Sequence, residues 1–140
     1  MDSLVVGDAD VLVALVLEED PHHKKVVDTI TNLMGSGIIV VFPNTAILEA
    51  VTTLKRSLNQ PQKAHLLVEK YLKEEFVVEY VNENIQRMAS PFFNEKAISK
   101  KNTIFDATVV TVAKSLNCKT IFSFDGWYTK LGFKLASDLF

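Results

Sequence analysis

A run of five consecutive apolar residues, Ile38 to Phe42, places the strongest constraint on the fold of this chain. Glycine and serine precede the run and Pro43 follows it, so it has the length and the boundaries of a strand. A strand without polar positions is typical of a sheet that is covered on both faces, and such sheets are mostly parallel. The run therefore predicts a parallel sheet between layers of helices.

Strand-like and helix-like segments alternate along the rest of the chain. Further strands are predicted at Leu4 to Gly7, Glu75 to Val81 and Lys119 to Phe124, with a marginal edge strand at Phe133 to Ala136. Helical spacing of apolar residues predicts helices over 11–17, 21–34, 43–56, 60–72, 82–97 and 106–116, and a short turn over 127–131. This order predicts right-handed βαβ crossovers and an α/β/α sandwich with about five parallel strands, formed by a single domain over residues 1–140.

Composition narrows the class of protein. Hydrophobic residues make up 48% of the chain and charged residues 23%, which favours a folded globular protein over a disordered one. The single cysteine, Cys118, excludes an intrachain disulfide and fits a cytoplasmic location. We expect neither a signal peptide nor a membrane span, because no basic segment precedes the first apolar run and no run is long enough.

Carboxylates follow two of the predicted strands. Asp8 comes directly after the first strand, with Asp10 two residues later, and Asp125 comes directly after the strand that ends at Phe124. The carboxyl ends of parallel strands meet at one edge of the sheet, where open α/β folds bind their ligands. We therefore expect Asp8 and Asp125 to lie near each other.

Two further acids can reach the same edge from helices. Asp106 lies near the start of its predicted helix, and Glu49 lies inside an amphipathic helix one turn after Thr45. Converging carboxylates repel one another unless a cation compensates them, and a set of oxygen ligands without His or Cys suits Mg²⁺ or Mn²⁺ better than zinc. Such a site is typical of metal-assisted phosphodiester hydrolysis.

Four segments, in chain order, resemble the acidic motifs of PIN-domain ribonucleases, whose best-known small members are the VapC toxins of toxin-antitoxin pairs. The segments are Asp8-Ala9-Asp10-Val11-Leu12, Thr45-Ala46-Ile47-Leu48-Glu49, Asp106-Ala107 and Phe122-Ser123-Phe124-Asp125. The resemblance spans Val5 to about Ala136. It implies a five-stranded parallel sheet in helical layers and an endoribonuclease activity that depends on Mg²⁺ or Mn²⁺. It also implies frequent homodimerisation and, for toxins, an antitoxin protein as partner.

The resemblance assigns roles to individual positions. Four residues match the acidic quartet of the family: Asp8, Glu49, Asp106 and Asp125. The three aspartates would hold the metal directly or through water, and the glutamate would complete the shell or orient water. Thr45 and Ser123 match small polar positions that would hydrogen-bond the carboxylates. Asp10 stands where the family often has Asn, Ser or Thr, and we expect it to cap the following helix rather than to bind metal. Gly7 stands where a bulkier apolar residue is common.

Other residues bear on substrate binding. The chain from Lys96 onward holds seven lysines against three aspartates, although the net charge of the whole protein is -2. Lys100 and Lys101, close before the third acidic motif, are the preferred contacts to RNA phosphates. Trp127 and Tyr128 are expected to pack against the sheet rather than to stack on a base.

Adjacent histidines at positions 22 and 23 occupy the start of a predicted helix. Neighbouring positions of a helix point in different directions, so joint metal binding is not expected. We interpret both residues as part of the solvated surface.

Three other functions remain open at this point. The segment from Asp8 to Val11 also resembles the opening motif of aspartate-nucleophile phosphatases of the haloacid-dehalogenase type. That class needs a flexible glycine-containing loop after the motif and a later pair of acids, whereas this chain continues into an apolar run and has the single Asp125. A PIN-like module could bind RNA or protein without catalysis, although four carboxylates facing phosphate would not help it. A catalytic PIN domain could also act in RNA processing outside a toxin-antitoxin pair.

Overall fold

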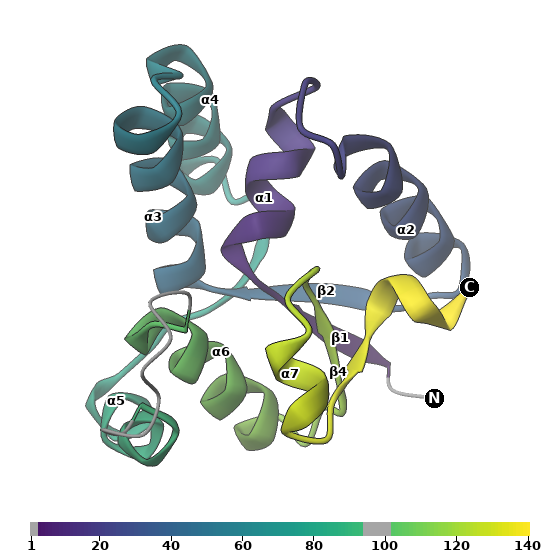
Figure 1. Ribbon diagram of the computed structural model, residues 1–140, viewed down its shortest axis with the longest axis vertical. Helices are drawn as coiled ribbons and strands as arrows, with labels where there is room; N and C mark the ends of the chain where they lie inside the picture. Colours follow the sequence, from purple (N-terminus) through teal and green to yellow (C-terminus); the bar gives the residue numbers. More distant parts are fainter. Residues whose placement is uncertain (1–2, 94–101) are drawn as a thin grey trace.

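A five-stranded parallel sheet in the order β3-β2-β1-β4-β5 forms the centre of the molecule (Figure 1). The computed structural model describes residues 3–93 and 102–140. The strands are β1 (Leu4–Gly7), β2 (Ile39–Pro43), β3 (Val77–Glu79), β4 (Thr120–Phe122) and β5 (Lys134–Leu135). The predicted parallel sheet and its number of strands are confirmed, and β1 is the central strand.

Helices cover both faces of the sheet (Figure 1). They are α1 (Ala9–Val16), α2 (His23–Gly35), α3 (Asn44–Thr52), α4 (Pro61–Leu72), α5 (Glu83–Ala89), α6 (Ile104–Ser115) and α7 (Trp127–Lys130). Short helical turns follow α3, α5 and β5: a π-helical turn η1 (Thr53–Ser57) and the 3₁₀ turns η2 (Ser90–Phe92) and η3 (Ala136–Leu139). The fold is therefore the predicted α/β/α sandwich.

Alternation of side chains along β1 divides the core into two clusters. Val5 packs on the face that α1, α2, α3 and α4 cover, whereas Val6 packs on the face that α5, α6 and α7 cover. This alternation follows from the pleat of a strand, which sends successive side chains to opposite faces. Both residues are at most 1% exposed, as expected for the central strand of a covered sheet.

Several boundaries differ from the prediction. The helix predicted over 82–97 ends as α5 at Ala89 and continues as η2, where Pro91 lacks the backbone N–H that an α-helix interior needs. The helix predicted to begin at Asp106 begins at Ile104, because Thr103 is its N-cap. Asp106 thus lies within the first turn of α6 and not at its entrance.

Gly7 is the last residue of β1 and lies directly before Asp8. A Cβ atom at this position would lie 2.2 Å from Cε1 of Phe42, whose ring comes from the neighbouring strand β2. Because Gly7 has no side chain, the Phe42 ring can occupy this space.

Among residues 3–93 and 102–140, no helix has the length and the apolar character that crossing a membrane would require.

Candidate metal centre

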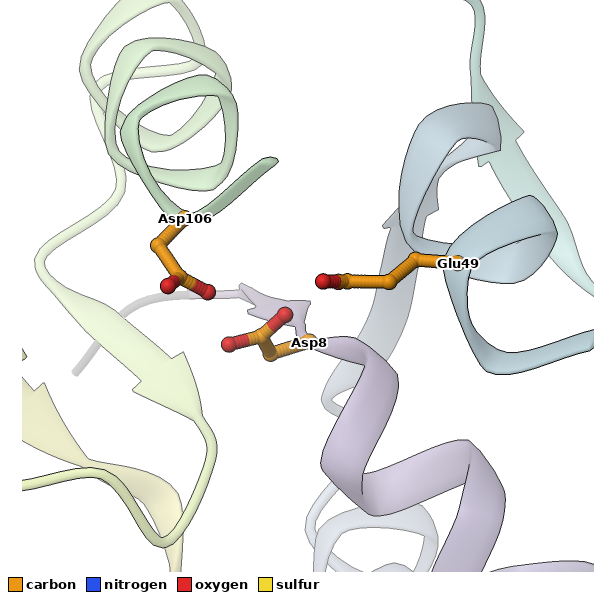
Figure 2. Close-up of side chains that lie close together, drawn as sticks. All are labelled: Asp8, Glu49 and Asp106. Atoms are coloured by element: carbon orange, nitrogen blue, oxygen red, sulfur yellow. The ribbon is translucent and has the colours of Figure 1, made fainter. Parts of the chain in front are cut away.

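Three acidic side chains from three different elements converge at the carboxyl end of β1. Asp8 follows β1, Glu49 lies in α3 and Asp106 lies in the first turn of α6. Figure 2 shows the three carboxylates pointing toward one another, and each offers an oxygen within 4.8 Å of an oxygen of both others. The structure therefore brings together three of the four acids that the sequence singles out.

Asp8 is held by two hydrogen bonds, one to each oxygen. Its side chain is buried; Oδ1 accepts from the backbone N–H of Ala9 at 2.7 Å, and Oδ2 accepts from the hydroxyl of Tyr128 at 2.5 Å. Asp8 is the N-cap of α1. The prediction that Asp10 caps this helix is therefore wrong, because the residue directly after the strand already occupies the cap position.

Asp106 is held by the start of α6. Thr103 and Asp106 form a capping box, in which Oδ2 of Asp106 accepts from the backbone N–H of Thr103 at 2.9 Å. Oδ1 lies 3.4 Å from the hydroxyl oxygen of Tyr128. A threonine three residues before an acid is a local signal that could have located this cap in the sequence.

Asp10 links α1 to the loop that follows β4. Its Oδ2 accepts from Oγ of Ser123 at 2.9 Å and from the backbone N–H of Phe124 at 2.8 Å. Oγ of Ser123 in turn accepts from the backbone N–H of Asp125 at 3.1 Å. Ser123 thus donates to Asp10 and not to one of the four predicted acids, and its supporting role in the site stays a prediction; together with Asp10 it positions the loop that carries Asp125.

Asp125 lies beside the three converging acids and is not one of them. Its Oδ1 accepts from the backbone N–H of Trp127 at 2.9 Å, and its Oδ2 accepts from Nδ2 of Asn102 at 3.2 Å. A role of Asp125 in holding a metal through water stays a prediction.

Two other predictions concern Thr45, which the structure describes, and a pair of lysines, which it does not. Among the described residues Oγ1 of Thr45 has no hydrogen-bond partner, so the predicted hydrogen bond from Thr45 to a carboxylate is not formed. Thr45 sits in the first turn of α3, one turn before Glu49, and its hydroxyl is buried. Lys100 and Lys101, the predicted phosphate contacts, lie outside the described residues.

The three acids line an open cavity of about 310 Å³. In the described part of the chain its lining holds no lysine or arginine, and its charged or titratable members are Asp8, Asp10, Asp20, Glu49, Asp106, Asp125 and His22.

The ring of His22 stacks on Phe124 with 4.2 Å between ring centroids, and the backbone N–H of His22 donates to Oδ1 of Asp20 at 2.8 Å. Sequence reasoning placed His22 on the solvated surface and missed this contact, because the stacking partner lies about a hundred positions away in the chain.

Burial and mutual repulsion disfavour the charged forms of these acids. Burial is the largest cause that raises the pKa of Asp8, and the negative charges of Asp10 and Asp106 raise it further. Burial also raises the pKa of Asp106, with Asp125 and Asp10 adding to it. Burial, followed by repulsion from Asp106 and Asp10, raises the pKa of Glu49 to about 7.

The donor set fits a hard divalent cation. The three converging groups are all carboxylates, which are the ligands that Mg²⁺ and Mn²⁺ prefer. Oδ1 of Asp10, which lies in the same cavity wall, is buried and has no hydrogen-bond partner among the described residues. Among the described residues, no lysine or arginine lines this cavity. A bound cation would therefore compensate the negative charge of the acids.

These shifts predict how the stability of the metal-free protein depends on pH. Because the pKa of Glu49 rises from 4.5 to about 7 on folding, the folded protein binds more protons than the unfolded chain between these pH values. The free energy of unfolding should therefore fall as pH rises from about 4.5 to about 7. Thermal unfolding in EDTA should show this slope, and the slope should be shallower in Glu49→Gln. Equal slopes in the two proteins would contradict the prediction.

Comparison with known proteins identifies a family and solved structures with a similar fold. The family model of the PIN domain matches residues 5–134. The crystal structure of VapC20 from Mycobacterium tuberculosis, described as a toxin that cleaves the sarcin-ricin loop, is similar with a TM-score of 0.76 and 21% sequence identity over 92% of this chain and 95% of that one. At this identity the likeness concerns the fold. No curated protein sequence matches.

Proposed function

Because this chain belongs to the PIN domain family, we propose that it is a metal-dependent endoribonuclease that hydrolyses phosphodiester bonds in RNA. The observation that carries the proposal is the convergence of Asp8, Glu49 and Asp106 in an open cavity. The acids of this cavity can bind a cation that an RNA phosphate can then approach. Without a cation the same cavity would repel RNA.

Asp8, Glu49 and Asp106 would hold Mg²⁺ or Mn²⁺ in this mechanism. When bound, the ion supplies a Lewis acid that neutralises phosphate charge and makes water a better nucleophile. The N–H of Ala9 and the N–H of Thr103 fix one oxygen each of Asp8 and Asp106, so these carboxylates are oriented before a cation arrives. The Asp10 and Ser123 hydrogen bonds hold the loop of Asp125, which would reach the ion through water.

The direct test is cleavage of RNA by the purified protein. We expect internal cuts in a single-stranded RNA in the presence of Mg²⁺ or Mn²⁺ and none in EDTA, with products resolved on a denaturing gel. Intact RNA under all metal conditions would favour a non-catalytic PIN-like module. Release of phosphate from a simple monoester without RNA cleavage would favour the phosphatase alternative.

We further propose that the protein is the toxin of a type II toxin-antitoxin pair. The support is the likeness of its fold to VapC20, which is itself a toxin. In this role the protein acts in the cytoplasm, binds an antitoxin and forms a homodimer. Induced expression should arrest growth, and co-expression of a small adjacent reading frame should relieve the arrest. Normal growth with an active nuclease would favour a role in RNA processing.

A further inference from the structure

We infer that Tyr128 is a positioning residue of the metal centre, whose hydroxyl lies between Asp8 and Asp106 and fixes the orientation in which these two carboxylates bind a divalent cation. The inference deepens the proposed function and rests on it for the presence of the cation.

The hydroxyl of Tyr128 contacts both acids. It donates to Oδ2 of Asp8 at 2.5 Å, and its oxygen lies 3.4 Å from Oδ1 of Asp106. A phenol has a single proton, and the shorter distance assigns that proton to Asp8. The polar contact to Asp106 is therefore the weaker one. The hydroxyl lies between the carboxylates of Asp8 and Asp106.

Tyr128 reaches the acids from within the core. Its side chain is 0% exposed and packs in the cluster formed by α5, α6 and α7, whereas the acids line the cavity. Tyr128 is not among the described residues that line the cavity, so its hydroxyl reaches the carboxylates from the core and not from the cavity that a cation or RNA would enter. This position suits a residue that acts through Asp8, and it does not allow direct contact with RNA.

The turn that carries Tyr128 is itself tied to the site. Tyr128 lies in α7, which begins two residues after Asp125, and Oδ1 of Asp125 accepts from the N–H of Trp127. Asp125 thus holds the first residue of α7, and the second residue of this helix, Tyr128, donates to Asp8. This connection gives Asp125 a structural link to the metal centre even though its own carboxylate lies outside the group of three.

A phenylalanine would fill the same space in the core, so packing alone does not require the hydroxyl. With Tyr128 and Ala9 as donors, both oxygens of Asp8 are held, and the carboxylate is oriented without a cation. Loss of a hydrogen bond that orients a metal ligand typically lowers metal affinity by about 10- to 100-fold. We expect a loss in this range when the hydroxyl is removed.

The test compares Tyr128→Phe with the wild-type protein and with Tyr80→Phe, a control at a position that is 63% exposed. Calorimetric titration with Mn²⁺ should give a dissociation constant about 10- to 100-fold higher for Tyr128→Phe and unchanged for Tyr80→Phe. RNA cleavage by Tyr128→Phe should approach the wild-type rate at saturating Mn²⁺, because the variant changes metal affinity and not contact with RNA. An unchanged dissociation constant in folded Tyr128→Phe would overturn the inference.

A measurement on the wild-type protein covers the case in which the variant does not fold. The buried hydroxyl proton of Tyr128 should give a far-downfield proton resonance, and this resonance should shift when Mg²⁺ is added. A resonance that Mg²⁺ leaves unchanged would overturn the inference. RNA cleavage separates the two proposals: a wild-type protein that binds Mn²⁺ more tightly than Tyr128→Phe but cuts no RNA contradicts the proposed function alone.

Discussion

Asp8→Asn is expected to lower metal-dependent RNA cleavage by about 100-fold or more while the protein remains folded. A metal ion contributes several kcal/mol to catalysis of this type, and each 1.36 kcal/mol corresponds to a factor of about ten in rate. Asparagine removes the negative charge and one of the oxygens that face Glu49 and Asp106. It keeps an acceptor for the N–H of Ala9, and asparagine is as good an N-cap as aspartate, so α1 should still form.

Initial rates of RNA cleavage at several Mn²⁺ concentrations measure the effect, with circular dichroism as the check on folding. Asp138→Asn is the matched control, because Asp138 is an exposed aspartate in η3 and does not line the cavity. A folded Asp8→Asn protein that cleaves RNA at the wild-type rate would refute the assignment of the metal centre.

Gly7→Ala is expected to have the largest effect on stability, a loss of about 1–3 kcal/mol in the free energy of unfolding. The new Cβ atom would lie 2.2 Å from Cε1 and 2.7 Å from Cδ1 of Phe42. Neither side can move easily, because β1 is paired on both edges and Phe42 is 5% exposed in the core. Denaturant unfolding measures the change.

Gly35→Ala is the control for this prediction. Nothing lies within 4 Å of a Cβ atom built at Gly35, the last residue of α2, so alanine there should leave stability unchanged or raise it slightly. Combining Gly7→Ala with Phe42→Leu should recover part of the loss, since the smaller side chain removes the ring that causes the clash. Equal stability of Gly7→Ala and the wild-type protein would show that β1 and β2 can separate at this point.

The parts of the fold that follow from local patterns could be predicted from the sequence. The apolar run that became β2 and the helical spacing on either side of it led to the parallel sheet with helices on both faces. Asp8 and Glu49 could be located because one follows a strand and the other lies on an otherwise apolar helix. Both properties depend on a few neighbouring residues.

The parts that depend on contacts between distant segments could not be predicted. Tyr128 donates to an acid 120 positions away, and nothing near it in the sequence distinguishes this tyrosine from one that only packs. The role of Asp10 has the same origin, since its partners are Ser123 and Phe124 in a loop far along the chain.

The position of β4 beside β1 determines when during synthesis the three converging acids can be held together. Asp8 is made early, yet its backbone N–H donates to the carbonyl of Phe122 at 3.0 Å and its side chain needs Tyr128. A nascent chain that has reached only α6 already contains Asp8, Glu49 and Asp106 but lacks the strand that completes the pairing of β1. The contacts that hold Asp8 beside Glu49 and Asp106 are therefore complete only after the segment from β4 to α7 has been translated.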